Sequence, residues 1–209
     1  ARSAPLVPSA SYPTQLQSLL LGRYTTQPSI TVINEGKSGE KASDAPPRFS
    51  AAMTTHRPEV VLLLEGYNGL AQDGGASSGA QAIATMAAEA RNRGARVFIA
   101  TLTPGKPGFR QIPDDIIRNY NDRMRAIARG EEAVLVDLYG ALVSDVNTWI
   151  GVDGLHPTEA GYRKMAETFF GSRQLDGIHL QCDQAAAGLK TLQDRQRMSA
   201  AAQRAIDGN

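Results

Sequence analysis

Residues 59–66 read EVVLLLEG, and this stretch decides the fold. Five apolar residues follow one another from Val60 to Leu64, without the polar and apolar alternation of a strand that has one face in water. A short, continuous apolar run is typical of a strand in a parallel sheet that helices cover on both faces. We therefore predict a buried strand here, followed by a turn at 65–70.

The segments on either side alternate between strand and helix patterns. Short β-branched or apolar runs predict three further strands, at 29–34 (SITVIN), 95–102 (ARVFIATL) and 133–138 (AVLVDL). Helices are predicted at 14–22, from the turn near residue 40 to about 56, at 77–94 with Ser77 or Ser78 as N-cap and Gly94 as C-cap, at 113–130 and at 158–170. This alternation predicts an α/β fold in three layers, α/β/α, around a parallel sheet.

The composition is that of an ordinary globular domain. Hydrophobic residues make up 42% and charged residues 21% of the 209, and 22 Lys and Arg against 21 Asp and Glu give a net charge of +1. This balance indicates neither a nucleic-acid nor an anionic membrane partner, and the longest apolar run is too short to span a bilayer. One cysteine, Cys182, and three scattered histidines match no metal-ligand spacing, and no glycine-rich nucleotide motif is present. We therefore expect no metal and no cofactor.

In an open parallel sheet, ligands bind beyond the carboxyl ends of the strands, so we expect the functional residues in the turns after the strands. Gly39 lies in the turn GKSGE, where an exposed backbone N–H could donate to an oxyanion. Asn68 comes after the strand at 59–66, and its side-chain amide could donate to the same oxyanion. In DGLHP, His156 could act as a general base with Asp153 holding its ring.

Each of these residues also has a purely structural interpretation. His156, next to a proline, could cap the helix after it, and Asp153 before a glycine could be a turn residue. Asn68 before Gly69 could adopt the left-handed conformation common in Asn-Gly turns. Gly39 could serve backbone geometry alone, although a tight turn would also expose its N–H.

Taken in order, these turns resemble the sequence blocks of the SGNH (GDSL-type) hydrolase family. VINEGKSGE (32–40) resembles the second block, LLLEGYNGL (62–70) the third and DGLHPTEAGY (153–162) the fifth, and SYPTQLQSLL (11–20) resembles the segment after the first block. The resemblance covers residues 11–170 and implies a flavodoxin-like sheet with strand order 2-1-3-4-5. It also implies that Asp153 and His156 are the acid and base of a triad and that Gly39 and Asn68 form the oxyanion hole.

The sequence departs from the family in two places. Gly69 stands where the third block usually has Asp, which should alter the support of the loop. The first block, a strand ending in Gly-Asp-Ser with the nucleophilic serine, is absent. An interior strand is costly to delete, because its neighbours lose their backbone partners. We therefore expect an upstream segment that carries this strand, with a second chain or a pseudoenzyme as the alternatives.

Three serines compete for the role of nucleophile. GASSG (75–79) matches the nucleophile-elbow pattern G-x-S-x-G. In such an elbow the serine lies on a turn that leads directly from a strand into a helix, but here about ten residues separate Ser77 from the preceding strand. Ser38 adjoins the oxyanion glycine, which leaves little room for a substrate carbonyl. Ser3 has no strand before it. All three are weak candidates, and the sequence leaves the nucleophile unknown.

The prediction is a hydrolase-like domain at 1–181 and a polar, helical or flexible tail at 182–209. The function expected from the resemblance is hydrolysis of carboxylic esters with short acyl or acetyl groups, on a small molecule or a glycan. The alternative is a non-catalytic relative that binds such esters. The resemblance also suggests a secreted or periplasmic location, and the residues indicate no particular oligomeric state. His56 and His179 have no recognisable partners and are predicted to lie at the surface.

Overall fold

Three short parallel strands form the sheet of this protein. The computed structural model describes residues 8–26, 29–72 and 74–172, and within them β1 (Val60–Leu63), β2 (Arg96–Ala100) and β3 (Val134–Val136) pair in the order β1-β2-β3. Val61 is in register with Val97, and Phe98 with Val134. The predicted strands at 59–66, 95–102 and 133–138 are therefore confirmed, although each is shorter than the apolar run that contains it.

The apolar run of β1 is continuous because both faces of the sheet are covered. Val61 and Leu63 point into one core cluster together with Ile99, whereas Val60 and Leu62 pack against a second cluster that contains Phe98. Successive side chains of a strand alternate between faces, so a strand buried on both sides needs apolar residues at every position.

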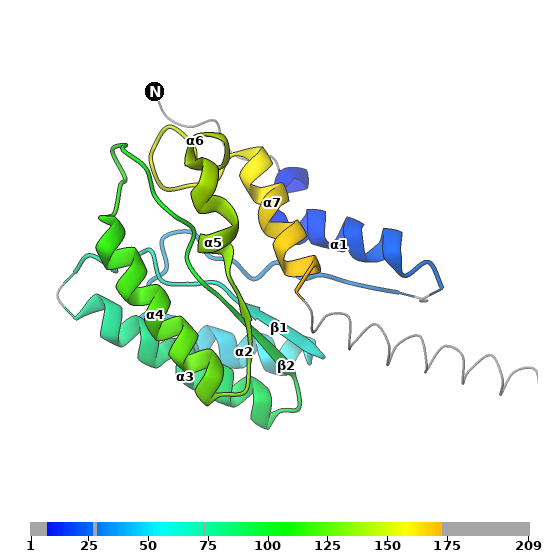
Figure 1. Ribbon diagram of the computed structural model, residues 1–209. Helices are drawn as coiled ribbons and strands as arrows, with labels where there is room; N and C mark the ends of the chain where they lie inside the picture. Colours follow the sequence, from blue (N-terminus) through cyan, green and yellow to red (C-terminus); the bar gives the residue numbers. More distant parts are fainter. Residues whose placement is uncertain (1–7, 27–28, 73, 173–209) are drawn as a thin grey trace, which may run out of the picture.

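Helices form a layer on each face of the sheet, and the three-layer α/β/α prediction is confirmed (Figure 1). One layer contains α2 (Pro46–His56), α3 (Gly75–Asn92) and α4 (Asp114–Gly130). The other contains α1 (Tyr12–Arg23), α5 (Leu138–Leu142) and α7 (Glu159–Phe170), with the short α6 (Val146–Trp149) leading into α7. Single 3₁₀ turns lie at Pro8–Ala10, Ala42–Asp44 and Val143–Asp145.

The ends of the helices reflect local chemistry. The hydroxyl of Thr158 caps α7 by accepting the N–H of Gly161 at 3.0 Å, so it is not His156 that caps this helix. Two acidic residues, Asp114 and Asp115, open α4, where the helix dipole favours negative charge. Gly94 comes after α3 with φ +84°, a left-handed conformation that glycine adopts without strain.

Two predictions about the elements are wrong. Residues 29–34 form no strand: the N–H of Val32 donates to the side-chain oxygen of Gln17 on α1 at 2.7 Å and pairs with no strand of the described chain. A β pattern becomes a strand only where a neighbouring strand accepts its hydrogen bonds. Ser77 and Ser78 do not cap α3, which begins earlier, after Gly74. The predicted tail at 182–209 lies outside the described residues.

No helix within the described ranges combines the length and the apolar character that crossing a membrane requires.

Candidate functional site

The segment from Asp153 to His156 is a closed turn that brings an acid and a base together. Ile150 and Pro157 form an antiparallel bridge, and the N–H of Gly151 donates to the carbonyl of His156 at 2.7 Å. Inside the turn, Asp153 Oδ2 lies 2.6 Å from His156 Nδ1. The Asp153 side chain is 2% exposed and the His156 side chain 50%. A buried carboxylate on one nitrogen of a half-exposed imidazole ring is the arrangement that a general base requires.

Asp153 is held in its ionised form by its neighbours. Burial alone would raise the pKa of this carboxyl, but hydrogen bonds from the His156 ring and from two backbone N–H groups outweigh burial and lower the pKa. Asp153 Oδ1 accepts the N–H of Leu155 at 3.1 Å and the N–H of His156 at 3.0 Å. A carboxylate fixed at both oxygens can orient the imidazole, so Asp153 is more than a turn residue: it closes the turn and contacts the ring.

A second loop, at 104–112, supports this turn from the side. The N–H of Lys106 donates to the carbonyl of Gly154 at 3.0 Å, and the N–H of Arg110 to the carbonyl of Asp153 at 2.9 Å. Gly154 has φ +87°, and a Cβ there would lie 2.4 Å from the carbonyl oxygen of Lys106. Only glycine combines a left-handed backbone with the absence of a Cβ, so the residue type at position 154 is determined by the loop that packs against this turn.

The loop after β1 is tied to the loop after β2 through Tyr67. Its hydroxyl donates to the carbonyl of Thr103 at 2.5 Å and lies 2.6 Å from the Thr103 hydroxyl. Asn68 is the next residue and lies at the surface, and its side chain makes no hydrogen bond to any residue of the described chain. Asn68 does not have a positive φ, so the left-handed interpretation is wrong; Gly69 takes that conformation instead, with φ +83°.

Gly39 lies in an exposed turn with φ +80°. Among the described residues no acceptor is bonded to its N–H, which is therefore free to donate to a ligand. The amine of Lys41, two residues further, donates to Gln72 Oε1 at 3.0 Å, which links the turn containing Gly39 to the loop containing Asn68. Contacts therefore run from the Gly39 turn through both strand-end loops to Asp153, at the carboxyl side of the sheet, as expected for a parallel α/β fold.

No serine of residues 8–26, 29–72 and 74–172 hydrogen-bonds to the His156 ring. Ser38 is exposed in the Gly39 turn, and Ser77 lies in the first turn of α3 with its N–H bonded to the carbonyl of Gly74. Ser3 lies outside the described residues. The nucleophile is thus not assigned by the geometry of the described chain.

The sequence did not point to several residues that shape the site. Tyr67 and Arg48 hold loops of the site through long-range hydrogen bonds, and no local motif marks either of them. His56 lies at the surface, as predicted, and has a partner that the sequence did not identify: its Nε2 lies 2.8 Å from Glu35 Oε1. Two surface hollows lie elsewhere. One of about 630 Å³ is lined by α3 and Glu131, the other of about 450 Å³ by residues of α6 and α7, and neither includes Gly39, Asn68 or His156.

The chain is similar in sequence to one protein family and in fold to several solved structures. The sequence model of the GDSL-like Lipase/Acylhydrolase family matches residues 3–164. A sequence comparison with curated proteins gives no match. The fold is similar to LAE5, an alpha/beta hydrolase enzyme from the metagenome of Lake Arreo, Spain, with a TM-score of 0.69 and 20% identity over 78% of this chain and 81% of that chain.

Two other crystal structures share the fold at similar distance. Axe2, an acetylxylan esterase from Geobacillus stearothermophilus, superimposes with a TM-score of 0.67 and 20% identity over 77% of this chain and 79% of its own. TesA superimposes with a TM-score of 0.63 and 22% identity over 81% and 91%. At these identities, the likeness establishes the fold.

Proposed function

The chain belongs to the GDSL-like lipase/acylhydrolase family, and from this we propose that it is a serine-dependent hydrolase of carboxylic esters with short acyl groups, acetyl above all. The single observation that carries the proposal is the buried Asp153 carboxylate 2.6 Å from Nδ1 of the half-exposed His156 ring. Three hydrogen bonds fix this carboxylate, so the ring is oriented before substrate arrives.

In the proposed reaction, Nε2 of His156 takes the proton of a serine hydroxyl while the serine oxygen attacks the ester carbonyl. The tetrahedral intermediate collapses, the alcohol leaves with the proton from His156, and an acyl-serine is formed. Water repeats the sequence: His156 removes its proton, the oxygen attacks the acyl carbon, and the acid and the free serine are released. Asp153 stays ionised throughout and stabilises the imidazolium that forms in each half.

The oxyanion of both intermediates would be stabilised by the backbone N–H of Gly39 and the side-chain amide of Asn68. Support comes from their availability, since neither donor is bonded to another residue of the described chain. A donor of this kind acts on charge that develops only in the transition state and contributes roughly 3–4 kcal/mol of barrier lowering.

The substrate class we propose is a small acetylated molecule or an acetylated glycan. One of the similar folds, Axe2, is an acetylxylan esterase, and this likeness of fold is the support for an acetyl group and for a glycan carrier. The His156 side chain is half exposed and lies outside both surface hollows, which suits a hydrophilic alcohol component better than a long acyl chain.

The test is hydrolysis of p-nitrophenyl acetate and of acetylated xylo-oligosaccharides by the full-length natural protein, with His156→Ala as the decisive variant. We expect the wild type to turn over and the variant to lose at least about a thousandfold in kcat while its circular dichroism spectrum is unchanged. Labelling with a serine-directed fluorophosphonate, followed by peptide mapping, would identify the nucleophile. A wild type that binds the acetyl ester without releasing acetate would contradict the proposal and favour the non-catalytic alternative.

A further inference from the structure

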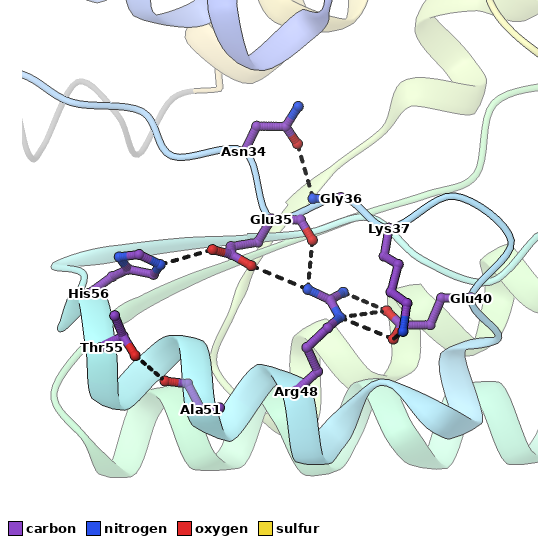
Figure 2. Close-up of polar contacts among 9 residues, drawn as sticks. All are labelled: Asn34, Glu35, Gly36, Lys37, Glu40, Arg48, Ala51, Thr55 and His56. Carbon is purple, nitrogen blue, oxygen red and sulfur yellow. Dashed lines mark hydrogen bonds and ion pairs between the residues drawn. The ribbon is translucent and has the colours of Figure 1, made fainter.

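Arg48, on α2, bridges both ends of the turn that contains Gly39. Its Nη1 donates to the carbonyl oxygen of Glu35 at 2.7 Å, before the turn. Its Nε and Nη2 donate to the carboxylate of Glu40 at 3.0 Å and 2.5 Å, directly after Gly39. Figure 2 shows the guanidinium lying between the two glutamates, with the Lys37 side chain reaching toward the Glu40 carboxylate. One planar cation therefore fixes residues 35 and 40, and the four residues between them form the turn.

The Glu40 end of this bridge is buried. The Glu40 side chain is 4% exposed, in contrast to 31% for Arg48 and 49% for Glu35. Hydrogen bonding from Arg48 lowers the pKa of Glu40 against the effect of its burial, so the carboxylate is ionised and needs a cation. Lys37 lies at 3.6 Å and is well exposed, so it provides a weaker second partner. The negative charge of the Glu40 carboxylate, next to Gly39, is thus neutralised mainly by Arg48.

The turn itself has little else to hold it. A Cβ built on Gly39 would meet no atom within 4 Å, so no neighbouring group packs against this residue. The one backbone hydrogen bond across the turn, from the N–H of Glu40 to the carbonyl of Lys37, is long at 3.4 Å. The direction of the Gly39 N–H is consequently set by the anchors on either side of the turn. His56 also bonds to Glu35 and Lys37 pairs with Glu40, but Arg48 is the described residue that bonds to both ends.

We propose that Arg48 is a positioning residue, which holds the Gly39 N–H in line for the oxyanion by bonding to Glu35 and Glu40 at the same time. The inference rests on the proposed function, because it concerns the oxyanion donor of that reaction. Arginine suits the task because its rigid fork bonds a carboxylate and a carbonyl simultaneously, whereas lysine offers a single charged centre. The helix α2 provides the rigid base from which the fork acts.

The test compares Arg48→Lys with a matched control, Arg93→Lys, in the full-length protein. Arg93 also bonds to α2, through Thr54 and Ser50, but makes no contact with the Gly39 turn. Arg48→Lys keeps the positive charge beside the buried Glu40 and should stay folded. We expect it to lower kcat on p-nitrophenyl acetate about tenfold or more with KM within about threefold, since a misplaced oxyanion donor affects the transition state alone. Arg93→Lys should leave both constants within about twofold.

Hydrogen exchange provides a second measurement that does not depend on activity. In Arg48→Lys the peptide covering residues 35–40 should exchange several-fold faster, while the peptide covering 153–156 should keep its rate. Unchanged exchange at 35–40, or unchanged kcat in a folded Arg48→Lys, would overturn the inference, as would an effect on KM alone. An active wild type with an unaffected Arg48→Lys would refute the positioning role and leave the esterase proposal intact. A wild type without esterase activity would refute both.

Discussion

Replacing Glu65 with glutamine should stabilise the protein above pH 7 and do so much less at pH 5. Glu65 lies just after β1 and is partly buried, and burial followed by the charge of Glu40 raises the pKa of its carboxyl to about 7. A hydrogen bond from the backbone of Gly66 and the charge of Arg48 act in the opposite direction but do not compensate. At neutral pH and above, the fold therefore contains a carboxylate in surroundings that favour the neutral acid.

The size of the effect can be derived from the displacement of this pKa. Each pH unit by which a pKa moves corresponds to about 1.4 kcal/mol. The change from an ordinary 4.5 to about 7 then sets an upper limit of about 3 kcal/mol on the penalty for ionised Glu65. Because part of the carboxyl reaches solvent, screening reduces this limit, and we expect about 1–2 kcal/mol. For a domain of this size, that gain raises the melting temperature by about 3–6 °C.

The sign is determined by which state binds the proton. Between pH 4.5 and about 7 the folded protein keeps the Glu65 proton and the unfolded chain has lost it, so the folded state binds more protons and stability falls as pH rises. Below this window both states are protonated, and glutamine resembles the neutral acid closely. Above the window the wild type has the full penalty and the variant has none.

The assay is urea unfolding at pH 5, 6, 7 and 8 for the wild type, Glu65→Gln and the control Glu59→Gln. Glu59 lies just before the same strand with an exposed side chain, so its replacement controls for the loss of one negative charge in this segment of the chain. The free-energy difference between Glu65→Gln and wild type should be smallest at pH 5, where it is already a fraction of the whole, and should increase to its full value at pH 8. An equal difference at all four pH values, or none at pH 8, would refute the reasoning.

Two further predictions concern single residues of the site. Asn68→Ala should lower kcat about 10²–10³-fold with KM nearly unchanged, because an oxyanion donor acts in the transition state; steady-state kinetics on p-nitrophenyl acetate would check this, and an effect on KM alone would assign Asn68 to ground-state binding. Gly154→Ala should destabilise the fold by about 1–3 kcal/mol in thermal unfolding, because its Cβ would lie 2.4 Å from the carbonyl oxygen of Lys106 at φ +87°. Gly130→Ala, where a Cβ meets no atom within 4 Å, is the control and should be neutral or mildly stabilising.

The sheet could be predicted because its signal is local. Val60–Leu64 are apolar without interruption, and a strand needs this pattern only where both faces are covered, so the pattern predicts both the strand and its helical layers. Residues 29–34 have an equally clear β-branched pattern and form no strand, because a strand also needs a partner for its backbone groups. In the described chain the N–H of Val32 donates to the side chain of Gln17 instead.

The start of α3 could not be located from serine positions alone. A serine caps a helix only when its own backbone is outside the helical conformation, and here Gly74, with φ +71°, is the N-cap, so Ser77 and Ser78 already lie inside the helix. Gly75 packs so closely that a Cβ would lie 2.0 Å from the carbonyl oxygen of Gly69, which fixes the early start. Gly69 and Gly75 are not related by the spacing of a helix or of a strand, so the sequence pattern does not predict their contact.

The candidate site has two parts, the Asp153–His156 pair and the proposed oxyanion donors Gly39 and Asn68. They differ in how distant in sequence the residues are that hold them in place. The proposed acid and base lie within four residues: Asp153 bonds to the N–H of Leu155, to the N–H of His156 and to the His156 ring, so the motif D-x-x-H contains most of its own geometry. The proposed oxyanion donors, Gly39 and Asn68, lie next to residues that bond to remote partners. The hydroxyl of Tyr67, next to Asn68, donates to the carbonyl of Thr103, which is 36 positions further along the sequence.

The two parts should therefore tolerate change differently. The turn 153–156 should depend less on distant segments, because the bonds that orient the Asp153 carboxylate are local and its one remote support among the described residues is the loop at 104–112. If Gly39 and Asn68 are the oxyanion donors, they should be sensitive to substitutions at Arg48 and at Tyr67, since these residues bond the loops that contain them to distant parts of the chain. A sequence motif can thus identify the acid and base of such a site, whereas the oxyanion hole can be identified only once the fold has brought its supports together.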